Sequence, residues 1–96
     1  MDIRQLFSGE HKGQKVTVRG WVRTFRANRF IALNDGSCLA NLQCVVDFEQ
    51  TPEEVLAEIN TGAALEISGT LVESQGKGQQ FEIQADSVTV LGGSNP

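Results

Sequence analysis

The sequence has few of the residues from which enzyme active sites are usually built. Its 96 residues include one histidine, His11, and two cysteines, Cys38 and Cys44, six positions apart. This set fits neither a zinc-ligand cluster nor a disulfide framework, and no Ser/His/Asp, Cys/His or G-x-x-x-x-G-K-S/T arrangement is present. We therefore expect no catalytic residue, no metal site, two reduced cysteines in or near the core, and His11 at the surface.

Long hydrophobic runs are also missing. Apolar runs are only a few residues long, as in "CVV" and "AAL", far short of the ~20 apolar residues needed to cross a bilayer. The N-terminal "MDIRQLFSGE" lacks the basic start and apolar stretch of a secretory signal. These absences predict a cytoplasmic protein with no membrane partner. A chain of 96 residues, 40% of them hydrophobic, is long enough for one small domain with a core.

Charge of one sign is missing from one stretch of an otherwise acidic chain. The formal net charge is −4, yet residues 11–34 contain six Lys or Arg residues and no Asp or Glu. Outside this stretch two basic residues stand against twelve acidic ones. A local basic segment attracts a polyanion even when the net charge is negative, so nucleic acid remains a candidate partner.

Five segments show the alternation of apolar and polar residues that is typical of β-strands. In each segment every second side chain belongs to an apolar set, which we expect to face a common core. The segments are 15–25, 29–35, 39–47, 64–74 and 79–85, with inward sets Val16 and Val18; Ile31 and Leu33; Leu42, Cys44 and Val46; Leu65, Ile67, Gly69 and Leu71; and Phe81, Ile83 and Ala85. Residues 86–92 either continue the last strand or pair separately.

Two short helical segments are expected beside the strands. Near the N-terminus Asp2 caps a turn whose apolar side is made by Ile3, Leu6 and Phe7 and which Gly9 ends. This turn is expected to close one end of the fold.

The second helical segment is "TPEEVLAEIN", between the third and fourth strand segments. Thr51 is the expected N-cap, Pro52 occupies the first helical position and Glu54 completes a capping box. The helix is expected to end near Gly62, with an apolar side formed by Val55, Leu56 and Ile59.

The order of these elements predicts an all-β, five-stranded OB-fold, a Greek-key barrel, with one short helix between strands 3 and 4 and a short N-terminal helical turn. An SH3-like barrel is the nearest rival, but such small barrels rarely carry a helix at that connection. Gly20, in the middle of the first strand, indicates a bend or bulge. The domain is expected to cover residues 1–92, with residues 93–96 as a linker-like tail.

OB-folds bind oligonucleotides on the face of strands 2 and 3 and with the loops between strands 1 and 2 and between strands 4 and 5. Single-stranded nucleic acid requires cations for phosphates, an aromatic ring for an unstacked base and amides for base edges. The sequence supplies these groups at the expected places, with Arg23, Arg26 and Arg29 around the first turn, Phe30 on strand 2, Asn41 and Gln43 on strand 3, and Lys77 in the last loop.

Each of these residues also has a structural interpretation. Phe30 would fill the mouth of the barrel if the strand phase were shifted, Gln43 would be an ordinary solvated strand residue, and the arginine cluster would be a solvated face. Trp21, beside Gly20, is more typical of a core ring than of a base platform.

The residues also resemble a known family. "VTVRGWVRTFRANRFIALNDGS" followed by "NLQCVV" resembles the N-terminal anticodon-binding domain of the class II aspartyl-, asparaginyl- and lysyl-tRNA synthetases. "NTGAALEISGTLVESQGKGQQFEIQADSVTVLG" is most similar to the asparaginyl member. The resemblance implies that Phe30 stacks on the middle anticodon base, a uridine, that Gln43 recognises the same base, and that Arg26 contacts the anticodon. Lys77 and Gln79 match a loop that discriminates the other anticodon positions.

The family's catalytic domain has no counterpart in this chain, which ends at "GGSNP" where a linker would begin. The chain is therefore expected to be an excised domain or a free-standing relative, and to bind a tRNA anticodon loop without a cofactor. ATP, magnesium and the homodimer contact of the parent enzyme belong to the absent domain. The alternatives are a protein-interaction module, a general single-strand binder, or the aspartyl or lysyl member of the family.

Overall fold

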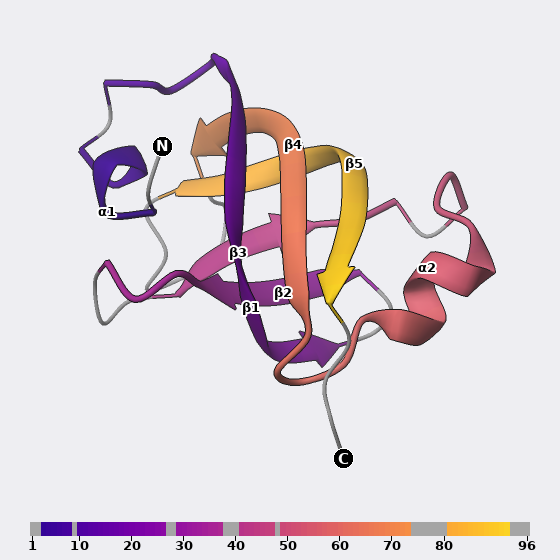
Figure 1. The fold of residues 1–96 in the computed structure, drawn as a ribbon. Coiled ribbons are helices and arrows are strands. Elements are labelled where there is room, and N and C mark those ends of the chain that lie inside the picture. Colours follow the sequence, from indigo (N-terminus) through magenta and orange to yellow (C-terminus); the bar gives the residue numbers. More distant parts are fainter. Residues whose placement is uncertain are drawn as a thin grey trace.

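The computed structural model describes residues 3–8, 10–26, 29–37, 41–47, 49–73 and 81–92. Within them five strands form a closed barrel in the order β1-β2-β3-β5-β4 (Figure 1). The strands are β1 (Lys15–Arg26), β2 (Phe30–Asn34), β3 (Leu42–Val45), β4 (Ala64–Glu73) and β5 (Phe81–Gly92), and the helices are α1 (Ile3–Leu6) and α2 (Glu53–Glu58). The predicted element order, with one helix between the third and fourth strands, is confirmed.

β1 belongs to both sides of the barrel. Its first part, from Lys15 to Trp21, pairs antiparallel with β4, and its second part, from Trp21 to Arg26, pairs antiparallel with β2. Where the partner changes, a Cβ on Gly20 would lie 2.6 Å from the backbone oxygen of Asn34. Glycine therefore permits a close backbone approach at this point. The irregularity in the β1–β2 register falls slightly later, between Val22 and Thr24.

Most of the core is made by the inward sets that the strand alternation predicts, although Phe81 and Ala85 of β5 are only half-buried against it. In β2, for example, Ile31 and Leu33 are buried, whereas Phe30 is exposed and Ala32 is half-buried. Residues 86–92 continue β5 as one strand. Ile3 and Leu6 of α1 are also buried. The remaining buried apolar residues are Val16, Val18, Val22, Leu42, Cys44, Val46, Ile59, Ala63, Leu65, Ile67, Leu71 and Ile83.

The predictions for the two cysteines and for His11 have different results in the structure. Burial raises the pKa of the Cys44 thiol, and the negative charge of Glu82 raises it further, so this thiol is held in its neutral, unreactive form. Cys38 lies outside the described residues. His11 is half-buried, with Nδ1 3.3 Å from Oε1 of Gln14.

The start of α2 differs from the prediction. Pro52, not Thr51, occupies the N-cap position, and no side chain caps the helix there, so the capping box with Glu54 is not formed. The Thr51 hydroxyl donates instead to the carbonyl of Asp47 at 2.8 Å, which closes a turn before the helix. α2 also ends at Glu58, earlier than predicted, and none of its residues is fully buried. The Thr51 hydroxyl thus bonds to a nearby backbone carbonyl instead of capping the helix, as serine and threonine hydroxyls often do.

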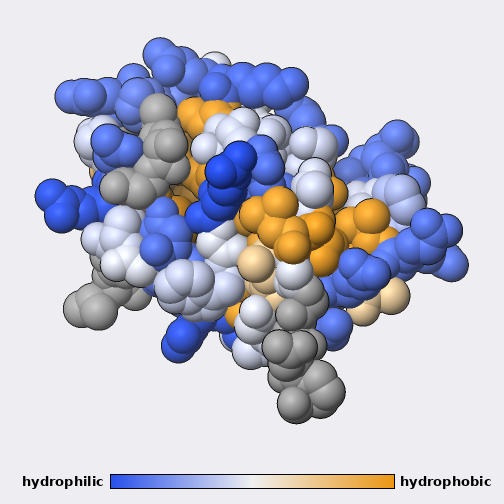
Figure 2. Space-filling model, in the orientation of Figure 1, coloured by the Kyte–Doolittle hydropathy of each residue, from blue (hydrophilic) through white to orange (hydrophobic). Residues whose placement is uncertain are grey.

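The surface is mostly hydrophilic, with one apolar patch over α2 and the end of β5 in the view of Figure 2. Leu91 is exposed there, while Val88, Val90, Val55 and Leu56 are half-buried against the core. No helix among the described segments is long and apolar enough to span a membrane. Nor do these segments contain three or more His, Cys, Asp or Glu side chains grouped to hold a metal ion.

Asp35 connects α1 to the turn after β2. Its carboxylate accepts hydrogen bonds from the backbone nitrogen of Ile3 at 2.8 Å and from Ser37 N and Oγ at 2.9 and 2.6 Å. The backbone nitrogen of Arg4 donates to Ser37 Oγ at 3.0 Å. Burial alone would raise the pKa of Asp35, but the hydrogen bonds from Ser37 and Ile3 outweigh it and lower the pKa. The expected cap, Asp2, lies outside the described residues.

We expect Asp35→Asn to lower the free energy of unfolding by about 1–2 kcal/mol at pH 7, because the amide keeps only one acceptor oxygen for these donors. The native pKa is lowered, so the carboxylate stabilises the fold above its unfolded-state pKa, and this contribution is lost as pH falls through the native value. Urea denaturation at pH 7 and pH 3 should show the deficit shrinking at pH 3. Asp86→Asn, at an exposed ion pair, is the control. An equal deficit at both pH values would contradict the account.

Candidate nucleic-acid interface

Strand register arranges the outer face of the barrel in rows. Arg26 of β1 pairs with Phe30 of β2, Phe30 with Val45 of β3, and Val45 with Gln84 of β5. These four side chains therefore lie side by side across four strands. The sequence places them on the outer face because the alternate residues of each strand are in the core.

A second row lies two residues along the strands. Ala32 of β2 pairs with Gln43 of β3, and Gln43 pairs with Glu82 of β5. An amide and a carboxylate therefore occupy neighbouring positions on two parallel strands.

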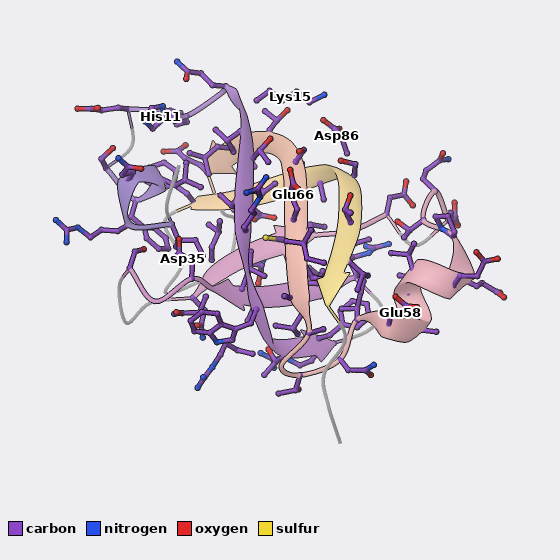
Figure 3. All side chains as sticks on the ribbon, viewed as in Figure 1. His11, Lys15, Asp35, Glu58, Glu66 and Asp86 are labelled. Atoms are coloured by element: carbon purple, nitrogen blue, oxygen red, sulfur yellow. The ribbon has the colours of Figure 1, made fainter. Side chains whose placement is uncertain are left out.

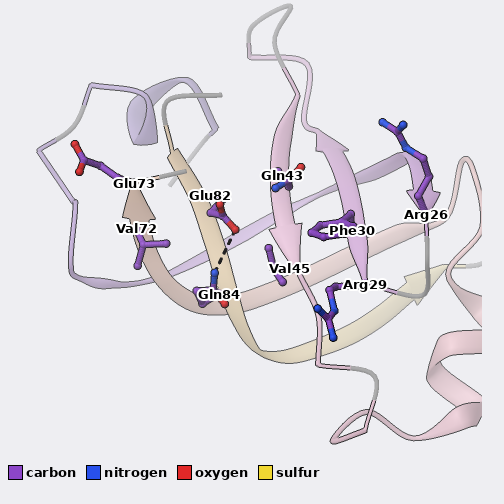
Figure 4. Close-up of a pocket in the computed structure, with 9 residues that line it drawn as sticks. All are labelled: Arg26, Arg29, Phe30, Gln43, Val45, Val72, Glu73, Glu82 and Gln84. Carbon is purple, nitrogen blue, oxygen red and sulfur yellow. Dashed lines mark hydrogen bonds between the residues drawn. The ribbon is translucent and has the colours of Figure 1, made fainter. Parts of the chain in front are cut away.

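The two rows form one groove with a volume of about 880 Å³ (Figure 4). Phe30 is 38% exposed within it and Gln43 is half-buried. The cationic side chains come from the end of β1 and from Arg29, just before β2, and the carboxylates come from β4 and β5. The lining residues are Arg26, Arg29, Phe30, Gln43, Val45, Val72, Glu73, Glu82 and Gln84.

Four of the predicted site residues, Arg26, Arg29, Phe30 and Gln43, meet in this groove. The alternative in which Phe30 fills the barrel mouth is wrong, because its ring is on the outer face. Two others lie elsewhere: Arg23 is exposed on β1, and Asn41 is half-buried and accepts a hydrogen bond from Nδ2 of Asn34 at 3.1 Å. The predicted Lys77 and Gln79 lie outside the described residues.

The basic stretch of residues 11–34 divides into two parts. In its first part Lys12, Lys15 and Arg19 form ion pairs with Glu73, Asp86 and Glu66, at N···O distances of 3.5, 3.2 and 3.5 Å. Lys15, Glu66 and Asp86 can be followed in Figure 3. Exposed pairs of this kind contribute little to stability, but they offset positive charge. Its second part, at the end of β1 and the start of β2, supplies the cations of the groove.

The acidic side of the groove is not predicted by the sequence pattern. Glu82 is a charged residue with only 7% exposure, and one carboxylate oxygen accepts a hydrogen bond from Nε2 of Gln84 at 3.2 Å (Figure 4). In the pattern of β5 it reads as an ordinary solvent-facing residue between Phe81 and Ile83. In the barrel Glu82 lies between Gln43 of β3 and Val72 of β4, and alternation within β5 cannot reveal these long-range pairings.

A closed five-stranded barrel with a helix between β3 and β4, and with a groove across β2 and β3, is the architecture of an OB-fold module. The SH3-like rival is thereby excluded. A family model for tRNA anticodon domains, described as an OB-fold nucleic acid binding domain, matches residues 16–91. The chain belongs to this family of OB-fold nucleic acid binding domains.

The relatives are consistent with that membership. The chain is 48% identical over 97 residues to an asparagine–tRNA ligase of Parabacteroides distasonis, and 50% identical over 93 residues to that of Bacteroides fragilis. These matches cover 98% and 94% of the chain but 21% and 20% of the relatives, so the chain spans about a fifth of their length.

A solved structure agrees with these sequence matches. The asparaginyl-tRNA synthetase of Entamoeba histolytica in complex with asparaginyl-adenylate superposes with a TM-score of 0.75 at 27% identity. The match covers 92% of this chain and 23% of that one. The predicted kinship with the anticodon-binding domain of the asparaginyl-type synthetases is confirmed.

Proposed function

We propose that this domain binds the anticodon loop of a tRNA in the groove of Figure 4, with the middle anticodon base stacked on Phe30. The observation that carries the proposal is the grouping of an exposed aromatic ring, a half-buried amide and two arginines in one groove of an anticodon-family domain. Stacking on an aromatic side chain contributes about 1–3 kcal/mol per base. The volume of about 880 Å³ lies within the range of small-ligand sites.

Gln43 lies two residues along the sheet from Phe30 and can pair with the edge of the stacked base. Its amide both donates and accepts, which matches the imino donor and carbonyl acceptor that uracil presents. This supports the role in uridine recognition that the family resemblance implies for Gln43.

The charge distribution orients the bound RNA strand in the groove. Arg26 and Arg29 stand on the β1–β2 side, whereas Glu73 and Glu82 stand on the β4–β5 side. Phosphates therefore run along the arginines, and base edges point toward β5. There the Glu82 carboxylate accepts only, so it suits a base edge that presents N–H donors. Part of this carboxylate is already held by Gln84.

The curated relatives are asparagine–tRNA ligases. We infer that the chain serves as the anticodon-binding part of such a ligase and does not itself charge tRNA. The inferred parent enzyme is a cytoplasmic homodimer that dimerises through its catalytic domain. That domain uses ATP and magnesium, and the anticodon module needs no cofactor.

The test is a titration of the protein with an anticodon stem-loop that carries a central uridine. We expect affinity to fall with increasing salt, and to fall about 5- to 150-fold when the central uridine is replaced by another base, because one mismatched base typically costs about 1–3 kcal/mol.

The same titration separates the alternatives. Equal affinity for all four central bases would overturn the proposal in favour of a general single-strand binder. No binding at low salt would overturn it in favour of a protein-interaction module. The matched control is the same stem-loop with a base pair of its stem exchanged, which is expected to bind unchanged.

A further inference from the structure

Trp21 is the second large aromatic ring on the outer face of β1 and β2. A large apolar side chain beside Gly20 is expected in the core, but Trp21 is 39% exposed, much as Phe30 is at 38%. Among the described residues Leu91 is the other exposed large hydrophobic side chain. The core expectation for Trp21 is therefore wrong, because its neighbour Val22 takes the inward position.

Register places Trp21 and Phe30 at opposite ends of the same face. Trp21 pairs with Asn34 at one end of β2, and Phe30 starts the strand at the other. The four-residue separation along β2 corresponds to about 13 Å. Phe30, Ala32 and Asn34 alternate with the buried Ile31 and Leu33, so β2 presents only Ala32 and Asn34 between the two rings. On β1 the exposed Thr24, which pairs with Ala32, lies on the same face.

Polar side chains lie near Trp21, as they do near Phe30. Its register partner Asn34 donates from Nδ2 to Oδ1 of Asn41 at 3.1 Å, which brings Asn41 to this end of the face. The backbone nitrogen of Gly36 donates to Oδ1 of Asn34 at 2.7 Å, and a Cβ built on Gly36 would lie 3.4 Å from the Trp21 ring. The ring therefore lies against an ordered turn.

A cation lies between the two rings along β1. Arg23 falls at the irregularity in the β1–β2 register, between Val22 and Thr24, and its side chain is exposed. It does not line the groove of Figure 4. Arg23 lies on β1 between Trp21 and Arg26, where it can contact an RNA phosphate outside the groove.

We propose that Trp21 is a second stacking platform, which binds a further nucleotide of the same single-stranded RNA outside the groove, with Arg23 contacting the connecting backbone. This inference rests on the proposed function, because it takes the strand bound at Phe30 as its starting point. Along β2 no large side chain separates the two rings, and the rings are equally exposed. Every base has a π-face, so the second platform is tolerant of base identity.

Trp21 is the only tryptophan in the chain, so its fluorescence reports directly on the proposed contact. The probes are an anticodon stem-loop with a central uridine and a trinucleotide that covers the anticodon alone. We expect the stem-loop to change the Trp21 emission on binding and the trinucleotide to bind without changing it. Binding itself is followed separately, by calorimetry.

Variants provide the second readout. Trp21→Leu is expected to weaken stem-loop binding about tenfold and to leave trinucleotide affinity unchanged, whereas Trp21→Phe retains a ring and restores most of the loss. Leu91→Ala, at an exposed apolar side chain away from the groove, is the control. Circular dichroism checks that each variant is folded, and the wild-type emission decides the question if Trp21→Leu does not fold.

The outcomes separate this inference from the proposed function. If the stem-loop binds but leaves both emission and Trp21→Leu affinity unchanged, the second platform is overturned while dependence on the central uridine still stands. An emission change with the trinucleotide would also overturn it, because the ring would then belong to the anticodon site. Loss of uridine dependence, by contrast, would overturn the proposed function.

Discussion

Gly69→Ala is expected to lower the free energy of unfolding by about 3 kcal/mol or more, since overpacking against backbone leaves no flexible neighbour to yield. A Cβ at this position would lie 2.1 Å from the backbone oxygen of Gln84 and 2.8 Å from Cα of Ala85. Both atoms belong to β5, the hydrogen-bonded partner of β4, so the two strands would have to separate. The β4–β5 register already shifts between Ser68 and Gly69. Urea denaturation followed by circular dichroism measures the effect.

Gly92→Ala provides a matched control. Gly92 is also in the β4–β5 pair, but a Cβ there meets nothing within 4 Å. We expect a change of less than about 0.5 kcal/mol, typical of an unconstrained surface position. If Gly69→Ala were as stable as Gly92→Ala, the close approach of β4 and β5 at Gly69 would be incorrect.

Phe30→Ala is expected to weaken binding of the central-uridine stem-loop by about 1–3 kcal/mol, which corresponds to about 5- to 150-fold in Kd. Phe30 is 38% exposed and contributes little to the core, so the free energy of unfolding should change little. Gln43→Ala should also weaken binding, and should reduce the preference for uridine at the middle position. Fluorescence anisotropy of a labelled stem-loop gives the affinities.

These two variants need both a binding and a stability measurement. Leu91→Ala removes a comparable exposed apolar side chain outside the groove and should bind as the wild type does. The assignment of the groove fails if Phe30→Ala and Gln43→Ala both bind with wild-type affinity. It fails equally if both unfold, because the residues would then be structural.

The sequence was sufficient to predict the barrel because its strands alternate strongly. A period of two residues assigns each side chain of β2 to one face, and the burial of Ile31 and Leu33 follows it. The same alternation placed Phe30 and Gln43 on the outer face, which is why both appear in the groove. Arg26 and Arg29 were correctly associated with them because they flank the turn between β1 and β2.

The failures share a different origin, since they depend on contacts between distant segments. Glu82 looks solvated in its own strand, yet it is only 7% exposed in the barrel, where β3 and β4 flank β5. Thr51 stands where an N-cap is expected, yet its hydroxyl donates to the carbonyl of Asp47. Trp21 is large and apolar, which favours the core, but Val22 already fills the inward position at that place in β1. Local sequence patterns cannot show which of the competing positions or partners such a residue takes in the fold.

The parallel pairing of β3 with β5 also has a kinetic consequence. Gln43 and Glu82 face each other across this pair although they are 39 positions apart in the chain. Pairings between distant segments carry a large loop-closure cost and tend to form late in folding. The groove therefore exists only once the barrel is closed, and an RNA held across it would stabilise the completed barrel by mass action. RNA binding would therefore slow unfolding that begins with the separation of β3 from β5.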